Sequence, residues 1–171
     1  DMSFDSVSAN NDKIGNMKTP YIDKLINDGI HFLDAHSGSS VCTPTRYGIL
    51  TGRYCWRTKL KSSVLWDYAA PLIGDTELTV AELLKQQGYT TGMVGKWHLG
   101  MIWRDKNGQI LNNDLQLSDA MFRPGDSKKR IKKVEASIDW KQKIGGPNDH
   151  GFDYFYEVGC FAEVQTRQIV R

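Results

Sequence analysis

The sequence has few cysteines, and they follow no recognisable pairing pattern. Its 171 residues contain Cys42, Cys55 and Cys160, with no C-x-x-C pair and no spacing typical of a metal site. An odd number of cysteines leaves at least one thiol unpaired or modified. A disulfide framework is therefore not expected, and an individual cysteine becomes a candidate for chemistry.

Long apolar runs and net charge are also missing. No run of about 18 apolar residues is present, so no membrane span is expected. Lys and Arg exceed Asp and Glu by 22 − 20 = 2, a field too weak to predict binding to nucleic acid or to an anionic membrane surface. No secretory leader opens the chain. Because the chain begins with Asp1 and not with Met, we expect its natural beginning to lie upstream.

What is present is typical of one globular domain, with 40% hydrophobic and 25% charged residues. A first amphipathic helix is predicted after Thr19, an N-cap residue followed by Pro20 at the first helical position, and Gly29 ends it. Residues 30–36 are rich in β-branched and aromatic side chains, which predicts a strand.

A second helix and two strands predict the fold class. Thr79 and Glu82 have the spacing of a capping box, and Gly88 ends the helical pattern. Residues 89–95 are typical of a buried strand, and residues 151–158 of another. This alternation predicts an α/β fold with a mostly parallel sheet flanked by helices. Ligands of such sheets collect at the carboxyl ends of the strands.

The segment 101–145 is the least regular part and is interpreted as an excursion from the core. The basic run K-K-R-I-K-K within it is interpreted as a solvated face with no catalytic part. Three histidines are expected to have structural or surface roles; they are His31, His36 and His150.

Cys42 stands at the predicted entrance of another helix, in the stretch V-C-T-P-T-R-Y. Pro44 suits the first turn, Gly52 suits the end, and residues 45–51 form the helix between them. The backbone N–H groups and the dipole at that end favour an anion. Arg46, one turn in, adds a planar fork of donors. An oxyanion substrate beside Cys42 is therefore predicted.

Two other interpretations of Cys42 were weighed. The first is a small buried hydrophobe beside a surface arginine, since free cysteine is among the most buried residue types. The second is the nucleophile of a thiolate phosphatase. That family's phosphate loop has its arginine six residues after the cysteine, and here Gly48 occupies that place. The spacing excludes the second interpretation.

Lys96 and His98 follow the predicted strand 89–95, where a parallel sheet presents its ligand site. Residues two apart in an extended segment project to the same side. Lys96 offers a positive charge, and His98 is the side chain best suited to exchange a proton near neutral pH. The alternative is an exposed lysine and a structural histidine around a buried Trp97.

The stretch C-T-P-T-R followed by Y-G-I-L-T-G-R resembles the signature of the type I sulfatases. Thr45 replaces the usual serine and keeps the hydroxyl. Three further stretches resemble family segments in the same order: residues 19–44, residues 80–100 with K-W-H-L-G, and G-F-D-Y-F-Y-E-V-G at 151–159. Together they cover most of residues 1–160.

The resemblance implies an alkaline-phosphatase-like fold, with residues 1–171 as the N-terminal part of a sulfatase catalytic domain. It implies that a formylglycine-generating or anaerobic maturation enzyme oxidises Cys42 to formylglycine. The hydrated aldehyde would attack the sulfur of a sulfated small molecule or carbohydrate, and collapse of the sulfated intermediate would release sulfate. Arg46 and Lys96 would hold the developing charge, and His98 would take a proton from the hydrate.

The resemblance also implies a calcium ion. Asp1 aligns with the second aspartate of the family's D-D-x-G segment, and carboxylate oxygens of this kind suit calcium. Asp1 and the modified Cys42 are thus the predicted metal ligands. The usual partner of Asp1 would precede residue 1, so the set is incomplete.

Two rival functions remain open on the sequence. The family's later metal ligands, second lysine and second histidine find no match in residues 157–171, so the chain alone could be a non-catalytic fragment. A phosphate or phosphonate ester hydrolase of the same superfamily would share the modified cysteine. Family members are usually exported or lysosomal, which favours a periplasmic, secreted or lysosomal location.

Overall fold

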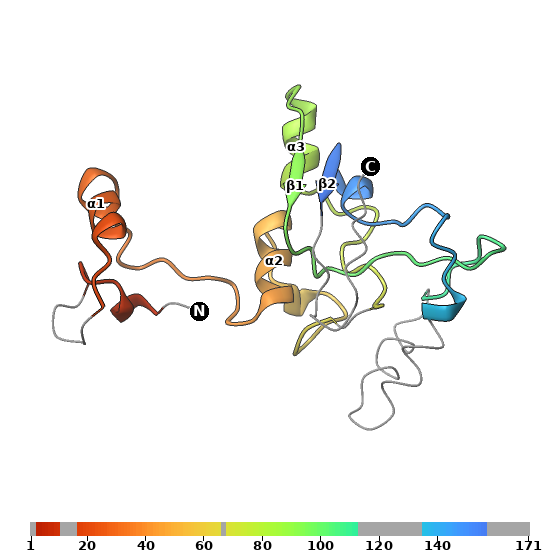
Figure 1. The fold of residues 1–171 in the computed structure, drawn as a ribbon, viewed down its shortest axis with the longest axis horizontal. Helices are drawn as coiled ribbons and strands as arrows, with labels where there is room; N and C mark the ends of the chain where they lie inside the picture. The colour runs from red at the N-terminus through yellow and green to blue at the C-terminus, as the bar shows by residue number, and fades with distance from the viewer. Residues whose placement is uncertain (1–2, 11–16, 66–67, 113–134, 157–171) are drawn as a thin grey trace. The chain divides into compact units, whose positions relative to one another are not determined.

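The computed structural model describes residues 3–10, 17–65, 68–112 and 135–156. The chain divides into two compact units, residues 1–36 and residues 37–171. Figure 1 shows α1 in the first unit, and α2, α3 and the paired strands β1 and β2 in the second. No described helix is long and apolar enough to cross a membrane.

The first unit contains a short 3₁₀ helix, Phe4–Ser6, and α1, Pro20–Asp28. Thr19 and Gly29 flank α1 as the sequence predicted. The Thr19 hydroxyl does not cap a backbone N–H but donates to Oδ1 of Asp23 at 2.8 Å. Asp23 also accepts from the Ser8 hydroxyl at 2.6 Å, and this bond chiefly lowers the pKa of the Asp23 carboxyl. The carboxylate therefore ties the start of α1 to the loop before it.

The strand predicted at 30–36 is wrong. This segment has neither strand nor helix, and the side chains of Phe32 and Leu33 are exposed. A strand requires a partner for its backbone hydrogen bonds, and no described strand pairs with these residues. Because the segment has strand propensity but no strand to pair with, it stays irregular.

The second unit contains the predicted helix and strand alternation. Its regular elements are α2 (Cys42–Thr51), a 3₁₀ helix (Cys55–Arg57), α3 (Val80–Gln86), β1 (Gly92–Val94), a 3₁₀ helix (Pro147–His150) and β2 (Tyr154–Tyr156). The strands β1 and β2 pair in parallel with Met93 opposite Phe155. The α/β class with a parallel sheet is therefore confirmed.

The strand β1 is less buried than predicted. Its Val94 side chain is 77% exposed, whereas Phe155 of β2 is 2% exposed. Parallel strands become buried on both faces when helices cover the sheet. The described sheet has only two strands, so Val94 lacks that cover.

The capping box at α3 is confirmed in both directions. The Thr79 hydroxyl accepts from the Glu82 N–H at 3.2 Å, and the Glu82 carboxylate accepts from the Thr79 N–H at 2.7 Å. Gly88, just past the helix, takes the left-handed conformation with φ +82°. The signals that start and stop α3 are therefore local, which is why the sequence predicted them.

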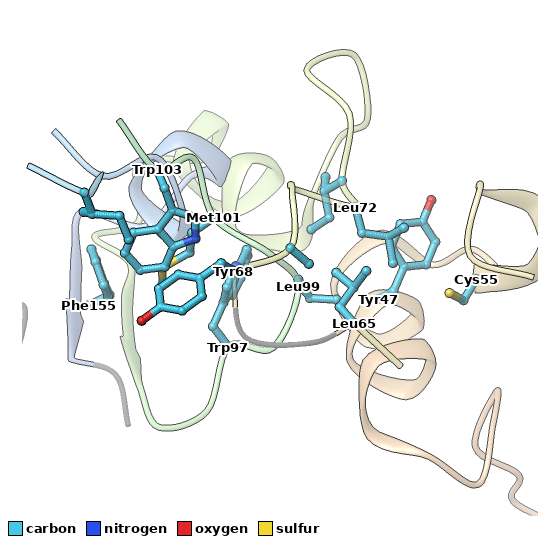
Figure 2. Packing of buried hydrophobic residues seen from close by; sticks show 13 residues of the cluster. Tyr47, Cys55, Leu65, Tyr68, Leu72, Trp97, Leu99, Met101, Trp103 and Phe155 are labelled. Atoms are coloured by element: carbon cyan, nitrogen blue, oxygen red, sulfur yellow. The ribbon is translucent and has the colours of Figure 1, made fainter. Parts of the chain in front are cut away.

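The core of the second unit joins residues that are distant in sequence (Figure 2). Tyr47 of α2, Leu65 and Leu99 gather at one end, and Trp97, Met101 and Trp103 lie further along. Residues 69–72 run beside residues 99–101 through two backbone hydrogen bonds. This core holds the start of α2 against the K-W-H-L-G segment.

Gly100 is required where those two segments meet. Its φ is +79°, and a Cβ atom there would lie 2.2 Å from the carbonyl oxygen of Ala70. No side chain fits at that distance, so the glycine permits the close approach of the two backbones. The fold therefore requires glycine as the last residue of K-W-H-L-G.

The described ends of the segment 101–145 pair through a bridge between Ile102 and Gly145. A second bridge, between Arg104 and Ile110, lies within its first end. The basic run lies at residues 128–133, outside the described part of the chain.

Candidate active site

Cys42 is the first residue of α2, three residues earlier than the predicted helical stretch. Val41 occupies the N-cap position in an extended conformation and supplies no capping side chain. The Cys42 thiol is free and half-buried. Gly52 ends the helix in the left-handed conformation, with φ +67°, as predicted. The helix start beside Cys42 therefore lacks a side-chain cap, as a helix end that receives an anion requires.

The hydroxyl of Thr45 ties α2 to the loop before it. It lies 2.8 Å from the carbonyl oxygens of Ser39 and Val41 and donates toward both. A serine hydroxyl could donate in the same way. The replacement of the usual serine by Thr45 therefore preserves a bond that holds the chain on both sides of Cys42.

Arg46 connects the two predicted motifs. Its Nη1 donates a hydrogen bond to the carbonyl oxygen of Lys96, 50 residues later in the chain. The Nε atom of Arg46 is buried and has no hydrogen-bond partner among the described residues. A buried donor without a protein partner is suited to bind an oxyanion.

His98 is buried at 1% exposure and takes φ +57°, which is uncommon for a residue other than glycine. The segment after β1 is therefore not uniformly extended, and simple alternation does not relate His98 to Lys96. The His98 Nε2 atom lies 2.6 Å from the carbonyl oxygen of Leu65. Since a carbonyl only accepts, Nε2 carries the proton, and Nδ1 is the basic nitrogen of the neutral ring.

The pKa of His98 depends on two of the other predicted site residues, Arg46 and Lys96. Burial lowers the pKa of His98, the hydrogen bond to Leu65 opposes that effect, and the charges of Lys96 and Arg46 lower the pKa further. Both cations therefore lie within electrostatic reach of the imidazole. His98 is consequently neutral near pH 7 and able to accept a proton.

The sequence did not reveal the roles of Thr43 and Leu65. Thr43 is 0% exposed, and its hydroxyl donates to the His98 carbonyl oxygen at 3.0 Å and accepts from the Leu65 N–H at 3.2 Å. Thr43 fills the variable position of the signature, and no local pattern marks Leu65. Only the folded chain shows that both contact His98.

The remaining histidines differ in setting. His36 is exposed and lies 2.6 Å from an Asp34 carboxylate oxygen. His150 is buried, stacks on Trp97 at 6.0 Å between ring centroids, and burial lowers its pKa. His150 therefore packs against Trp97, the residue between Lys96 and His98 in the sequence.

A cavity of about 220 Å³ lies beside His150. It is lined by Pro71, Asp75, Ile102, Arg104, Lys143, Gly145, Gly146, Asp149 and His150. Cys42, Arg46, Lys96 and His98 are not among these residues, so this cavity is separate from the predicted site.

The predicted calcium ligands are not brought together by the described residues. Asp1 lies outside the described part of the chain. Within that part, no group of three or more His, Cys, Asp or Glu side chains could hold a metal ion. The described donors therefore do not form a calcium site on their own.

The four predicted residues lie in a chain that is similar to known proteins. A family model described as Sulfatase matches residues 1–169. The chain belongs to the sulfatase family. Calcium and formylglycine are general features of this family.

Two curated relatives illustrate the similarity. An N-acetylgalactosamine-6-O-sulfatase of Bacteroides thetaiotaomicron is 43% identical over 101 residues, which cover 57% of this chain and 19% of that protein. Arylsulfatase H of Homo sapiens is 37% identical over 158 residues, which cover 88% of this chain and 22% of that protein. The chain thus spans about a fifth of the length of these relatives.

A solved structure supports the fold. It was described in work on the metabolism of multiple glycosaminoglycans by Bacteroides thetaiotaomicron, and it matches 99% of this chain and 29% of its own with a TM-score of 0.66 and 27% identity. Together with the family match, this likeness confirms the alkaline-phosphatase-like α/β fold class.

Proposed function

We propose that this chain carries part of the catalytic centre of a sulfuric ester hydrolase, with Cys42 as the formylglycine precursor. The observation that carries the proposal is the hydrogen bond from Arg46 to the Lys96 carbonyl oxygen. This bond joins the two motifs that the sequence nominated separately. The named relatives, which are sulfatases, add support.

Each residue has a role that its surroundings favour. Arg46 and Lys96 bind the sulfate oxygens and stabilise the charge that develops on them. His98, neutral and protonated on Nε2, accepts a proton on Nδ1. Formylglycine at position 42 supplies a hydrated aldehyde as the nucleophile. The uncapped N–H groups at the start of α2 favour an anion at that position.

Asp1 and the modified residue 42 are the proposed calcium ligands, on the strength of the sequence resemblance. Carboxylate oxygens suit this ion. The described residues supply no complete ligand set, so other donors are required.

The remaining proposals concern the whole protein. Residues 1–171 are proposed to be the N-terminal part of its catalytic domain, and residues 101–145 an excursion from it. The substrate is a sulfated small molecule or carbohydrate, in keeping with the relatives' names. A formylglycine-generating or anaerobic maturation enzyme acts on Cys42, and the proposed location is periplasmic, secreted or lysosomal.

The modification is tested by mass spectrometry of the peptide that contains residue 42. The chain is produced together with a maturation enzyme, and the aldehyde is expected in place of the thiol. An unmodified thiol, in a preparation where a control sulfatase is converted, would contradict the proposal. A Cys42→Ala variant controls for the assignment of the peptide.

The reaction is tested with paired aryl esters. A formylglycine-bearing form that includes the rest of the domain is expected to hydrolyse the sulfate ester faster than the phosphate ester. The opposite preference would favour the phosphate or phosphonate hydrolase. The 171-residue chain alone is expected to be feeble or inactive, and robust turnover by it would show that the fragment suffices.

A further inference from the structure

The start of α2 contains a buried hydroxyl that the proposed reaction does not use. Thr43 follows Cys42 directly, yet its side chain is 0% exposed while Cys42 is half-buried. A buried hydroxyl is costly unless it is hydrogen-bonded. Thr43 has a bond in each direction, donating to the His98 carbonyl oxygen at 3.0 Å and accepting from the Leu65 N–H at 3.2 Å.

Leu65 closes the network with its other backbone group. Its N–H donates to Thr43, and its carbonyl oxygen accepts from Nε2 of His98 at 2.6 Å. Three segments are thus tied in a ring of hydrogen bonds: Thr43 binds the backbone of His98, Leu65 binds Thr43, and the imidazole of His98 binds Leu65. A ring of this kind constrains the backbone and the side chain of His98 together.

The backbone of His98 needs such a constraint. Its φ of +57° is left-handed, a conformation that is unfavourable for a residue with a Cβ atom. A residue persists in this conformation when its surroundings over-determine it. The bond from Thr43 to the His98 carbonyl oxygen is one such restraint, and the bond from the ring to Leu65 is a second.

We propose that Thr43 is a positioning residue that fixes the imidazole of His98 relative to Cys42. Thr43 is joined to Cys42 by a peptide bond and to His98 by its hydroxyl, so it sets the spacing between the two. Through Leu65 it also holds the proton on Nε2 and leaves Nδ1 as the basic nitrogen. The hydrogen-bond ring stands by itself, and only its catalytic consequence rests on the proposed function.

The chain contains a matched control for this inference. Thr79 is 1% exposed, and its hydroxyl donates to the carbonyl oxygen of His150 at 2.8 Å and accepts from the Glu82 N–H at 3.2 Å. Removing that hydroxyl breaks the same kinds of bond without breaking any bond of Thr43, Leu65 or His98. Thr79→Val therefore reproduces the general loss of a buried hydroxyl.

The first experiment follows the histidine side chains by NMR in the ¹⁵N-labelled chain. The sequence has only four histidines, so their ring signals can be assigned by substitution. In the wild-type protein we expect His98 to be the Nε2–H tautomer with slow exchange of that proton. In Thr43→Val the exchange should rise roughly fivefold, since one net hydrogen bond is worth about 1 kcal/mol. Thr43→Ser should restore slow exchange.

The control and the wild type keep the test decisive. Thr79→Val should leave the His98 signal within about twofold of the wild type, although it removes a comparable hydrogen bond. An equal change in Thr43→Val and Thr79→Val would overturn the proposal. Should Thr43→Val not fold, the wild type decides: rapid exchange of either the Leu65 amide or the His98 ring proton would contradict the hydrogen-bond ring.

The second experiment measures the catalytic consequence in the formylglycine-bearing enzyme. Because Thr43 lies within the modified motif, rates are divided by the fraction of residue 42 found as aldehyde. Thr43→Val should lower kcat by roughly ten- to a hundredfold with little change in KM, since a misplacement of about 1 Å can have that effect. An unchanged kcat would refute positioning. Absence of any wild-type turnover, with the NMR result as expected, would count against the proposed function alone.

Discussion

The two helices α2 and α3 of the larger unit begin in opposite ways. At α3, Thr79 and Glu82 satisfy each other's backbone groups within a single turn. At α2, Val41 supplies no capping side chain, and Thr43 forms its bonds with residues 22 and 55 positions later in the chain. One helix start is closed by its neighbours in sequence, whereas the other is held from a distance and left uncapped beside Cys42.

The difference separates a helix start whose N–H groups are satisfied by its own side chains from one that lacks such a cap. A capped start such as α3 has used its free N–H groups to hold its own first turn. An uncapped start keeps N–H groups and positive potential for a ligand. Thr43 and Thr79 nevertheless share a feature, because each donates to the carbonyl oxygen of a buried histidine: His98 for Thr43 and His150 for Thr79. Substitutions at the two starts should therefore affect different properties.

The largest effect is expected for Arg46→Lys at the uncapped start. Lysine retains the charge but loses the planar fork that reaches both the Lys96 carbonyl oxygen and a bound oxyanion. The value of kcat/KM for an aryl sulfate should fall by about 10²- to 10³-fold in the formylglycine-bearing enzyme. Arg57→Lys, at an exposed arginine, is the control. A loss below about threefold in Arg46→Lys would remove this arginine from the proposed site.

At the capped start of α3, Thr79→Ala should affect stability instead. It removes the acceptor for the Glu82 N–H and the donor to the His150 carbonyl oxygen. The free energy of unfolding should fall by about 2 kcal/mol, measured by urea denaturation. Thr79→Ser keeps both bonds and serves as the control. A loss under about 0.5 kcal/mol would mean that the capping box contributes little.

Sequence reasoning succeeded where the determinants were local. Thr19 and Gly29 bounded α1, and the spacing of Thr79 and Glu82 predicted α3. It failed for residues 30–36, because propensity does not supply a partner strand. It also could not find the Thr43 bond to His98, since nothing in a one-dimensional pattern relates residues 55 positions apart.

The site residues show the same division. Cys42 and Arg46 could be nominated because their spacing is local and resembles a signature. The left-handed φ of His98 was not foreseen, because it depends on bonds from Thr43 and to Leu65 that form only in the folded chain. The sequence thus nominated the chemical groups, and the structure supplied what holds them.

A smaller effect is expected when the uncapped start of α2 receives a capping side chain. Val41 has the extended conformation of an N-cap, with φ −125° and ψ 160°, so Val41→Ser can cap α2 without strain. We expect a gain of about 0.5 to 1 kcal/mol in unfolding free energy relative to Val41→Ala. Inhibition by inorganic sulfate should weaken at the same time, since the capping oxygen would take the Thr43 N–H, and Pro44 at the third helical position has none. A gain in stability with unchanged inhibition would show that sulfate does not use this helix end.

The smallest effect concerns acid, and it distinguishes the two buried histidines, His98 and His150. Burial lowers the pKa of both rings below 6.5, so each is neutral in the folded chain near pH 7. The unfolded chain binds these protons first as the pH falls, so the stability held above pH 6.5 is progressively lost until the folded-state pKa is passed.

The charges around each ring predict which histidine contributes more to the pH dependence of stability. At His98 the bond to Leu65 raises the pKa, but both nearby charges, Lys96 and Arg46, lower it; at His150 every nearby charge, Glu82 first, raises the pKa. The slope of unfolding free energy between about pH 5 and 7 should therefore decrease more in His98→Asn than in His150→Asn, as measured by urea denaturation at several pH values. An equal decrease would mean that the two cations do not act on His98. Since Arg46 lies one turn into α2 and Glu82 lies in the first turn of α3, the ordering of the slopes also tests whether the two helix starts differ in their charge.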